Sequence, residues 1–117
     1  MPARILIIDD EESMCNFMEI MLAKEGYQVE STTSANSGIT NLKEKNYDLV
    51  ITDLNMPEMS GIEVLKEIRQ FKKDQDLIVM TAYASVDTAI EAMKQGASDY
   101  ITKPFKVEEV KLLVEKN

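Results

Sequence analysis

The sequence predicts an α/β fold, in which a doubly wound parallel sheet is covered by helices on both faces. Two observations support this prediction. Five short apolar runs alternate with five segments of helical periodicity along the 117 residues, and polar residues close most of the apolar runs. Strict alternation of strands and helices is typical of parallel sheets. Right-handed crossovers then place helices on both faces of the sheet.

The first strand is predicted at residues 5–8, where a continuous apolar run suits a strand buried on both faces. Asp9 and Asp10 close this run. A helix follows, with apolar residues at three–four spacing: Met14, Phe17, Met18, Met21 and Leu22. Glu11 and Glu12 fall in its first turn, where the helix dipole favours acidic side chains, and Gly26 ends it.

The same strand–helix pattern repeats four times. Strands are predicted at residues 28–31, 49–51, 77–80 and 99–101, and helices at 35–43, 64–71, 86–95 and 107–114. The strand at 28–31 is the least apolar, so we expect it at an edge of the sheet. The helix at 86–95 carries an apolar stripe and ends at Gly96; the stripe consists of Val86, Ala89, Ile90 and Met93.

The composition indicates one globular domain over residues 1–117. The net charge of -8 repels nucleic acid, so we expect no direct DNA or RNA binding by this segment. No apolar run approaches the roughly 18 to 20 residues that span a bilayer, so we expect no membrane segment. The single cysteine, Cys15, excludes an intrachain disulfide and favours a cytoplasmic location. Without histidine or a second cysteine, the chain lacks the usual zinc ligands.

Polar residues at the ends of the predicted strands form the candidate site. Asp9 and Asp10 follow the first strand, Asp53 the third, Thr81 the fourth and Lys103 the fifth. Because the carboxyl ends of parallel strands share one edge, we expect these side chains to converge. Three neighbouring carboxylates need compensating positive charge, which a divalent cation and one lysine supply. The oxygen ligands predict Mg2+.

This set of residues suits phosphoryl transfer. A carboxylate can act as the nucleophile and form an aspartyl phosphate, while the protein positions the group and neutralises its charge. We predict that Asp53 attacks, with Mg2+ held by Asp10 and Asp53 and reached by Asp9 through a water molecule. Lys103 would pair with a second phosphoryl oxygen, and the Thr81 hydroxyl would donate a hydrogen bond to a third.

Four segments in order resemble the CheY-like receiver domains of bacterial response regulators: residues 7–11, 53–61, 81–82 and 103–105. The resemblance extends over essentially the whole chain. It implies a flavodoxin-like (βα)5 fold with strand order 2-1-3-4-5, and a sensor histidine kinase as phosphodonor. It also implies a backbone carbonyl ligand to Mg2+ from Asn55 and a cis peptide before Pro104. Such a domain is a phosphoacceptor for signalling that catalyses its own phosphorylation and dephosphorylation.

The resemblance also implies an output surface. Thr81 and Tyr100 would be the switch pair, coupling phosphorylation to the face formed by the helix at 86–95, the strand at 99–101 and the final helix. An output domain or a second receiver copy would dock on this face. Residues 81–100 are similar to receivers of NtrC-like, sigma-54-dependent activators. This likeness implies that the chain is the N-terminal part of a longer regulator of transcription.

Other interpretations remain open for the same residues. Asp9 and Asp10 alone could cap a helix, Asp53 could be a turn residue, and Lys103 could be a solvated lysine. A phosphatase of the haloacid dehalogenase type requires its nucleophile after the first strand and a second acid two residues later. In this chain Asp53 follows the third strand, and Asn55 is the residue two positions later. A flavodoxin-like cofactor carrier needs a phosphate-binding loop after the first strand, but residues 9–12 are all acidic. A receiver-shaped interaction module that is never phosphorylated is the third alternative.

Overall fold

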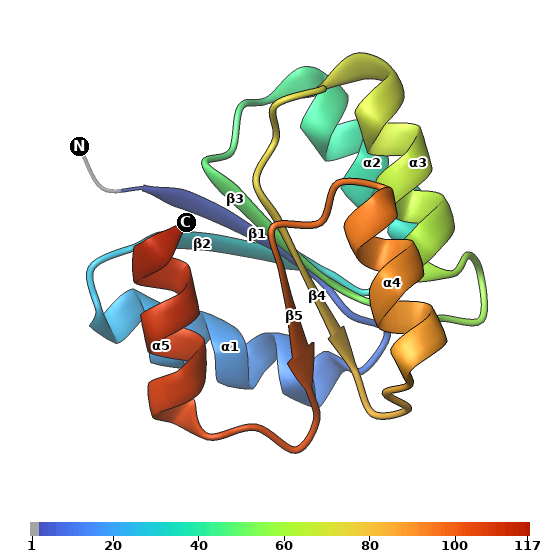
Figure 1. Ribbon diagram of the computed structural model, residues 1–117. Helices are drawn as coiled ribbons and strands as arrows, with labels where there is room; N and C mark the ends of the chain where they lie inside the picture. The colour runs from blue at the N-terminus through green and yellow to red at the C-terminus, as the bar shows by residue number, and fades with distance from the viewer. Residues whose placement is uncertain (1–2) are drawn as a thin grey trace.

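A computed structural model describes residues 3–117. Five strands form one parallel sheet in the order β2-β1-β3-β4-β5 (Figure 1). The strands are β1 (Arg4–Ile8), β2 (Gln28–Thr32), β3 (Leu49–Asp53), β4 (Leu77–Thr81) and β5 (Asp99–Thr102). The predicted parallel sheet is confirmed, as is the strand order that the receiver resemblance implied.

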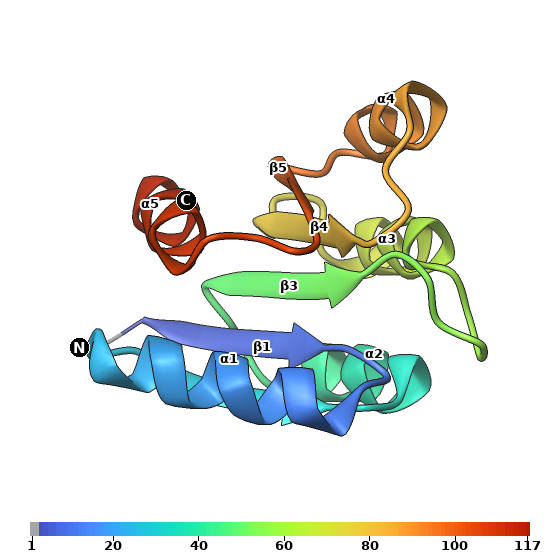
Figure 2. The ribbon, with the colours of Figure 1, turned by 90° about the horizontal axis from the view of Figure 1, so that it is seen from below.

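Helices cover both faces of the sheet, as predicted. They are α1 (Glu12–Lys24), α2 (Ala35–Glu44), α3 (Gly61–Phe71), α4 (Val86–Lys94) and α5 (Val107–Lys116). Figures 1 and 2 show α1 and α5 on one face, and α2, α3 and α4 on the other. Within residues 3–117, no helix is long and apolar enough to cross a membrane.

The alternation of side chains along the strands explains the continuous apolar runs. In β1, Ile5 and Ile7 pack in the core beneath α1 and α5, whereas Leu6 and Ile8 pack in the core beneath α2 and α3. Successive strand residues point to opposite faces, so a strand covered on both sides needs apolar residues throughout. β3 and β4 are buried along their whole length for the same reason. β2 lies at the edge and is less buried, as expected.

Two helices differ from the sequence pattern in which face is buried or where they begin. The stripe on α4 faces solvent, because Val86, Ile90 and Met93 are 75%, 49% and 49% exposed while Ala92 is buried. α4 lies against β5 and α3, and its buried residue Ala92 belongs to the core beneath α2 and α3. α1 begins at Glu12, so Glu11 is the N-cap residue and lies outside the first turn.

Candidate active site

Three carboxylates converge at the carboxyl edge of the sheet, as the strand ends predicted. Asp9 and Asp10 follow β1, and Asp53 is the last residue of β3. One oxygen from each carboxylate lies within 4.8 Å of the other two. Asp9 and Asp53 are buried, whereas Asp10 is exposed. A set of carboxylate oxygens with one ligand open to solvent is suited to a hard divalent cation that keeps part of its water shell.

Lys103 supplies one positive charge to this cluster. It follows β5, and its ammonium lies 2.9 Å from Asp9 Oδ2 and 3.6 Å from Asp53 Oδ1. Its side chain is only 10% exposed. Burial lowers the pKa of Lys103, but the hydrogen bond and charge of Asp9 and the charge of Asp53 outweigh it, so the pKa is raised overall. The lysine is therefore charged at neutral pH.

The carboxylate of Asp53 is not fully compensated. Burial raises its pKa, the charge of Lys103 opposes that effect, and the charge of Asp9 adds to it, giving a pKa of about 6. The backbone N–H of Asn55 lowers this pKa, and the Asp10 side chain raises it. One ammonium among three carboxylates leaves an excess of negative charge. The residues present therefore fit a bound cation, which would remove this excess.

Asp9 has both of its carboxylate oxygens engaged within the protein. Oδ1 accepts a hydrogen bond from the backbone N–H of Glu11 at 2.9 Å, and Oδ2 accepts one from Lys103 at 2.9 Å. This buried residue therefore orients the lysine and fixes the turn from β1 into α1. The simpler interpretation of Asp9 as a helix cap is wrong, because α1 has Glu11 as its N-cap residue and no side-chain cap, and Asp9 accepts the N–H of Glu11 rather than one from the first turn of the helix.

Thr81 is buried at the end of β4 and is bonded to the loop that follows β3. Its hydroxyl donates to Asn55 Oδ1 at 2.5 Å and accepts from the backbone N–H of Tyr83 at 3.0 Å. Sequence reasoning placed the backbone of Asn55 at this site but missed its side-chain bond to Thr81. The signal available was a polar residue two positions after a strand-end aspartate.

Tyr100 lies on β5, on the same face as Thr81 but two residues earlier in the sheet register. It pairs with Val79 of the neighbouring strand, whereas Thr81 pairs with Thr102. Its hydroxyl forms a 2.9 Å hydrogen bond with Thr88 Oγ1. Thr88 also forms the capping box of α4 with Ser85. The structure thus links Tyr100 to the start of α4, a contact that the sequence pattern did not reveal.

The loop after Asp53 closes tightly onto the strand end. The Gly61 N–H donates to the Leu54 carbonyl at 2.7 Å. A Cβ at Gly61 would lie 2.6 Å from Leu54 Cα and 2.7 Å from the Asp53 carbonyl oxygen, so a side chain does not fit. Gly61 is therefore needed for close approach rather than for an unusual turn. The Lys103–Pro104 peptide is cis, as the resemblance implied.

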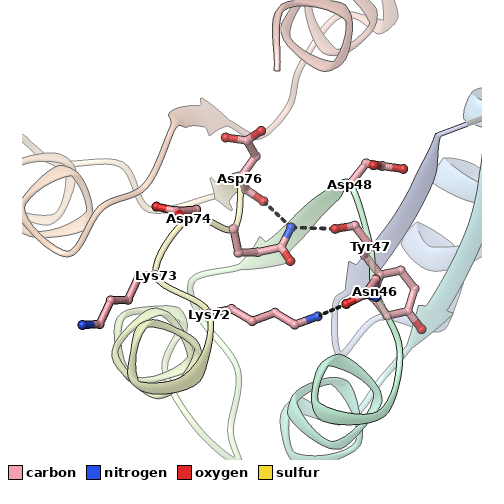
Figure 3. Close-up of a pocket in the computed structure, with 8 residues that line it drawn as sticks. Asn46, Tyr47, Asp48, Lys72, Lys73, Asp74 and Asp76 are labelled. Atoms are coloured by element: carbon pink, nitrogen blue, oxygen red, sulfur yellow. Dashed lines mark hydrogen bonds between the residues drawn. The ribbon is translucent and has the colours of Figure 1, made fainter.

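A hollow of about 430 Å³ lies at the amino ends of the strands, next to the starts of β3 and β4 (Figure 3). Two loops line it, residues 46–48 and 72–76. Gln75 Nε2 donates to the carbonyls of Tyr47 and Asp76, and Lys72 Nζ donates to Asn46 Oδ1 (Figure 3). The bonds from Gln75 to Tyr47 and from Lys72 to Asn46 join the two loops, so we interpret the hollow as a structural contact between them, separate from the acidic cluster.

Comparisons with known proteins agree with this geometry. The family model described as "Response regulator receiver domain" matches residues 5–115. The transcriptional regulatory protein ZraR of Klebsiella oxytoca is 43% identical over 92% of this chain and 24% of its own length. The regulatory protein AtoC of Escherichia coli K12 is 38% identical over 97% of this chain and 24% of its own length. The chain thus spans about a quarter of the length of these relatives.

Solved structures give the same result. The chemotaxis protein CheY4 of Vibrio cholerae superposes with a TM-score of 0.94 at 26% identity, covering 99% of this chain and 98% of that one. The beryllofluoride-activated NtrC4 receiver domain dimer superposes with a TM-score of 0.92 at 33% identity, covering 97% of this chain and 93% of that one.

Proposed function

The chain belongs to the response regulator receiver domain family, and from this premise we propose that it accepts a phosphoryl group on Asp53 in a Mg2+-dependent reaction. The observation that carries the proposal is the position of Asp53. Its carboxylate is buried at the end of β3, within 4.8 Å of the oxygens of Asp9 and Asp10, and faces the ammonium of Lys103. It thus has the charged surroundings that an acceptor of a dianionic group requires.

In the proposed reaction, a carboxylate oxygen of Asp53 forms a bond to phosphorus as the bond from phosphorus to the donor breaks. With a sensor histidine kinase as donor, the departing atom is an imidazole nitrogen, which keeps the bonding electron pair. A pKa of about 6 leaves Asp53 mostly ionised at neutral pH, as a nucleophile must be. Lys103 is placed to neutralise charge on a phosphoryl oxygen.

When bound, Mg2+ would neutralise charge on the phosphoryl group and help to orient it. Asp10, Asp53 and the backbone carbonyl of Asn55 would hold the cation. Asp9 would reach it through a water molecule, while its own oxygens keep their hydrogen bonds to Glu11 and Lys103. The open position of Asp10 is consistent with a cation that retains water ligands.

We further propose that phosphorylation shifts an existing equilibrium between two conformations. Thr81 would leave Asn55 and donate its hydroxyl to the phosphoryl group, and Tyr100 would move with it. The α4-β5-α5 face would then bind an output domain or a second receiver copy. The exposed apolar side chains of Val86, Ile90 and Met93 on α4 support this location.

The relatives support a wider proposal about the whole regulator. ZraR is named a transcriptional regulatory protein, and this chain matches about a quarter of its length. We propose that residues 1–117 act as the N-terminal receiver of a longer regulator of transcription, with nucleic acid bound by another part. The net charge of -8 agrees with that division. The cytoplasmic location expected from Cys15, which is buried and unpaired, stays a prediction.

Incubation with a small acyl phosphate and Mg2+ tests the proposed chemistry. We expect the intact protein to gain the mass of one phosphoryl group, and Asp53→Asn to gain none. Continuous release of phosphate from a common phosphatase substrate would instead favour the phosphatase interpretation. Equal labelling of both proteins would remove Asp53 as the acceptor.

A further inference from the structure

The loop between β3 and α3 is fastened to the start of α2 by one carboxylate. Glu58 Oε1 accepts the backbone N–H of Ala35 at 2.6 Å, and Oε2 accepts the side-chain amide of Asn36 at 2.8 Å. The Ser34 hydroxyl also donates to Glu58, at 3.2 Å. The first N–H groups of a helix have no partner within the helix, and its dipole favours a negative charge there. Glu58 therefore has a specific binding place on α2.

α2 has a cap of its own without Glu58. The Ser34 side chain is the N-cap and accepts the backbone N–H of Ser37 at 3.2 Å. Glu58 reaches α2 from a loop more than twenty residues later in the chain. The bonds of Glu58 therefore stabilise the loop, which has little regular structure, more than they stabilise the helix, which is already capped.

The loop carries Asn55, whose position matters to the candidate active site. The backbone N–H of Asn55 lowers the pKa of Asp53, and its side chain accepts the hydroxyl of Thr81. The start of the loop is fixed by the Leu54 N–H, which donates to the Met80 carbonyl at 2.8 Å. Its end is fixed at Gly61. Between these two points, the loop has polar attachments through the Asn55 side chain, to Thr81, and through Glu58, to α2.

We propose that Glu58 is a positioning residue, which anchors the β3–α3 loop on α2 and thereby holds Asn55 where its carbonyl can bind Mg2+. This inference rests on the proposed function. If the loop leaves this position, only the fraction of molecules with Asn55 in place is competent to bind the cation. The apparent affinity for Mg2+ falls in proportion to that fraction.

Titration with Mg2+ alone, followed by the amide NMR signals of residues near Asp53, tests the proposal. We expect Glu58→Ala to weaken Mg2+ binding by roughly tenfold, the lower end of the effect of removing a group that orients a metal ligand. Glu58→Gln keeps one of the two acceptor oxygens at the same reach, so it should weaken Mg2+ binding less than Glu58→Ala does. Glu67→Ala is the matched control, because Glu67 is an exposed glutamate on α3 with no ion pair or side-chain hydrogen bond among residues 3–117.

A second variant on α2 separates anchoring from charge. Asn36→Ala removes one bond to Glu58 without changing the loop sequence or the net charge, so it should weaken Mg2+ binding by a smaller factor. It should have no further effect in a Glu58→Ala background, because the two residues act through one contact. Thermal unfolding of each variant shows that the fold is kept.

The possible failures are distinguishable. If Glu67→Ala weakens Mg2+ binding as much as Glu58→Ala does, the negative charge rather than the anchor is responsible, and the inference is overturned. The inference is also overturned if Glu58→Ala binds Mg2+ as tightly as the unmodified protein does. That result would leave the proposed function intact. If the unmodified protein neither binds Mg2+ nor accepts a phosphoryl group, the proposed function and this inference fall together.

Discussion

Replacing Asp53 by asparagine should make the protein more stable at neutral pH, because it removes a poorly compensated buried charge. The pKa of Asp53 is raised from an ordinary value of 3.8 to about 6, mainly by burial, with Lys103 opposing and Asp9 adding to the shift. The folded protein thus keeps the proton to a higher pH than the unfolded chain. The free energy of unfolding therefore falls as the pH rises from about 4 through about 6. Asp53→Asn lacks this decrease because asparagine does not ionise.

The shift corresponds to about 3 kcal/mol when each pH unit contributes about 1.4 kcal/mol. Part of this range lies near the isoelectric point of about 4.5, where proteins are least soluble. Between pH 5 and pH 7.5, the ionisation of Asp53 lowers the free energy of unfolding by about 1.4 kcal/mol. The advantage of Asp53→Asn over the unmodified protein should grow by that amount across this interval, because the other titrating groups are common to both proteins.

Urea unfolding of both proteins at pH 5 and pH 7.5, with a chelator present, measures this difference. Added Mg2+ at pH 7.5 should then stabilise the unmodified protein more than Asp53→Asn, because binding to the folded state raises its free energy of unfolding. A stability difference between the two proteins that stays constant from pH 5 to pH 7.5 would contradict this expectation, since Asp53 would then have the same pKa in the folded and unfolded states.

Four further variants test other parts of the site. Gly61→Ala forces a Cβ against the Leu54 backbone and should lower the free energy of unfolding by about 1 to 3 kcal/mol; unchanged urea unfolding would contradict the close approach. In Thr81→Ala, amide shifts caused by beryllofluoride and Mg2+ should persist near the acceptor but shrink in α4, β5 and α5; if the distant shifts keep their full size, Thr81 is not the coupling residue. Asp9→Ala should lower the free energy of unfolding by about 1.5 to 3 kcal/mol, because it removes the hydrogen-bonded partner of Lys103 while Asp53 stays close to the ammonium. Asp10→Ala should weaken Mg2+ binding more than Asp9→Ala does, and the reverse order in a Mg2+ titration would exchange their roles.

The sheet and the convergence of the acids could be predicted because both follow from local patterns. An apolar run such as residues 5–8 is long enough for a strand buried on both faces, and its closing aspartates must lie at the carboxyl edge. The same logic brings Asp53 and Lys103 together from strands that are distant in sequence. The parallel topology explains this convergence, since it places the carboxyl ends of all strands on one side of the sheet.

Contacts made by loops could not be predicted in this way. The bonds of Glu58 to α2 and of Asn55 to Thr81 depend on the path of the β3–α3 loop, which no periodicity records. The exposed stripe on α4 shows a second limit. Helical spacing identifies an apolar face at Val86 and Ile90, but it does not tell whether that face packs in the core or is exposed to solvent.

The most direct test of the central claim is to locate the phosphoryl group on the chain. After phosphorylation by a small acyl phosphate with Mg2+, borohydride reduces an aspartyl phosphate to homoserine, which peptide mass spectrometry can assign to one position. We expect homoserine at position 53 and unmodified aspartate at positions 9 and 10. Homoserine at position 9 or 10, or a phosphoryl group on a hydroxyl side chain with position 53 unchanged, would contradict it.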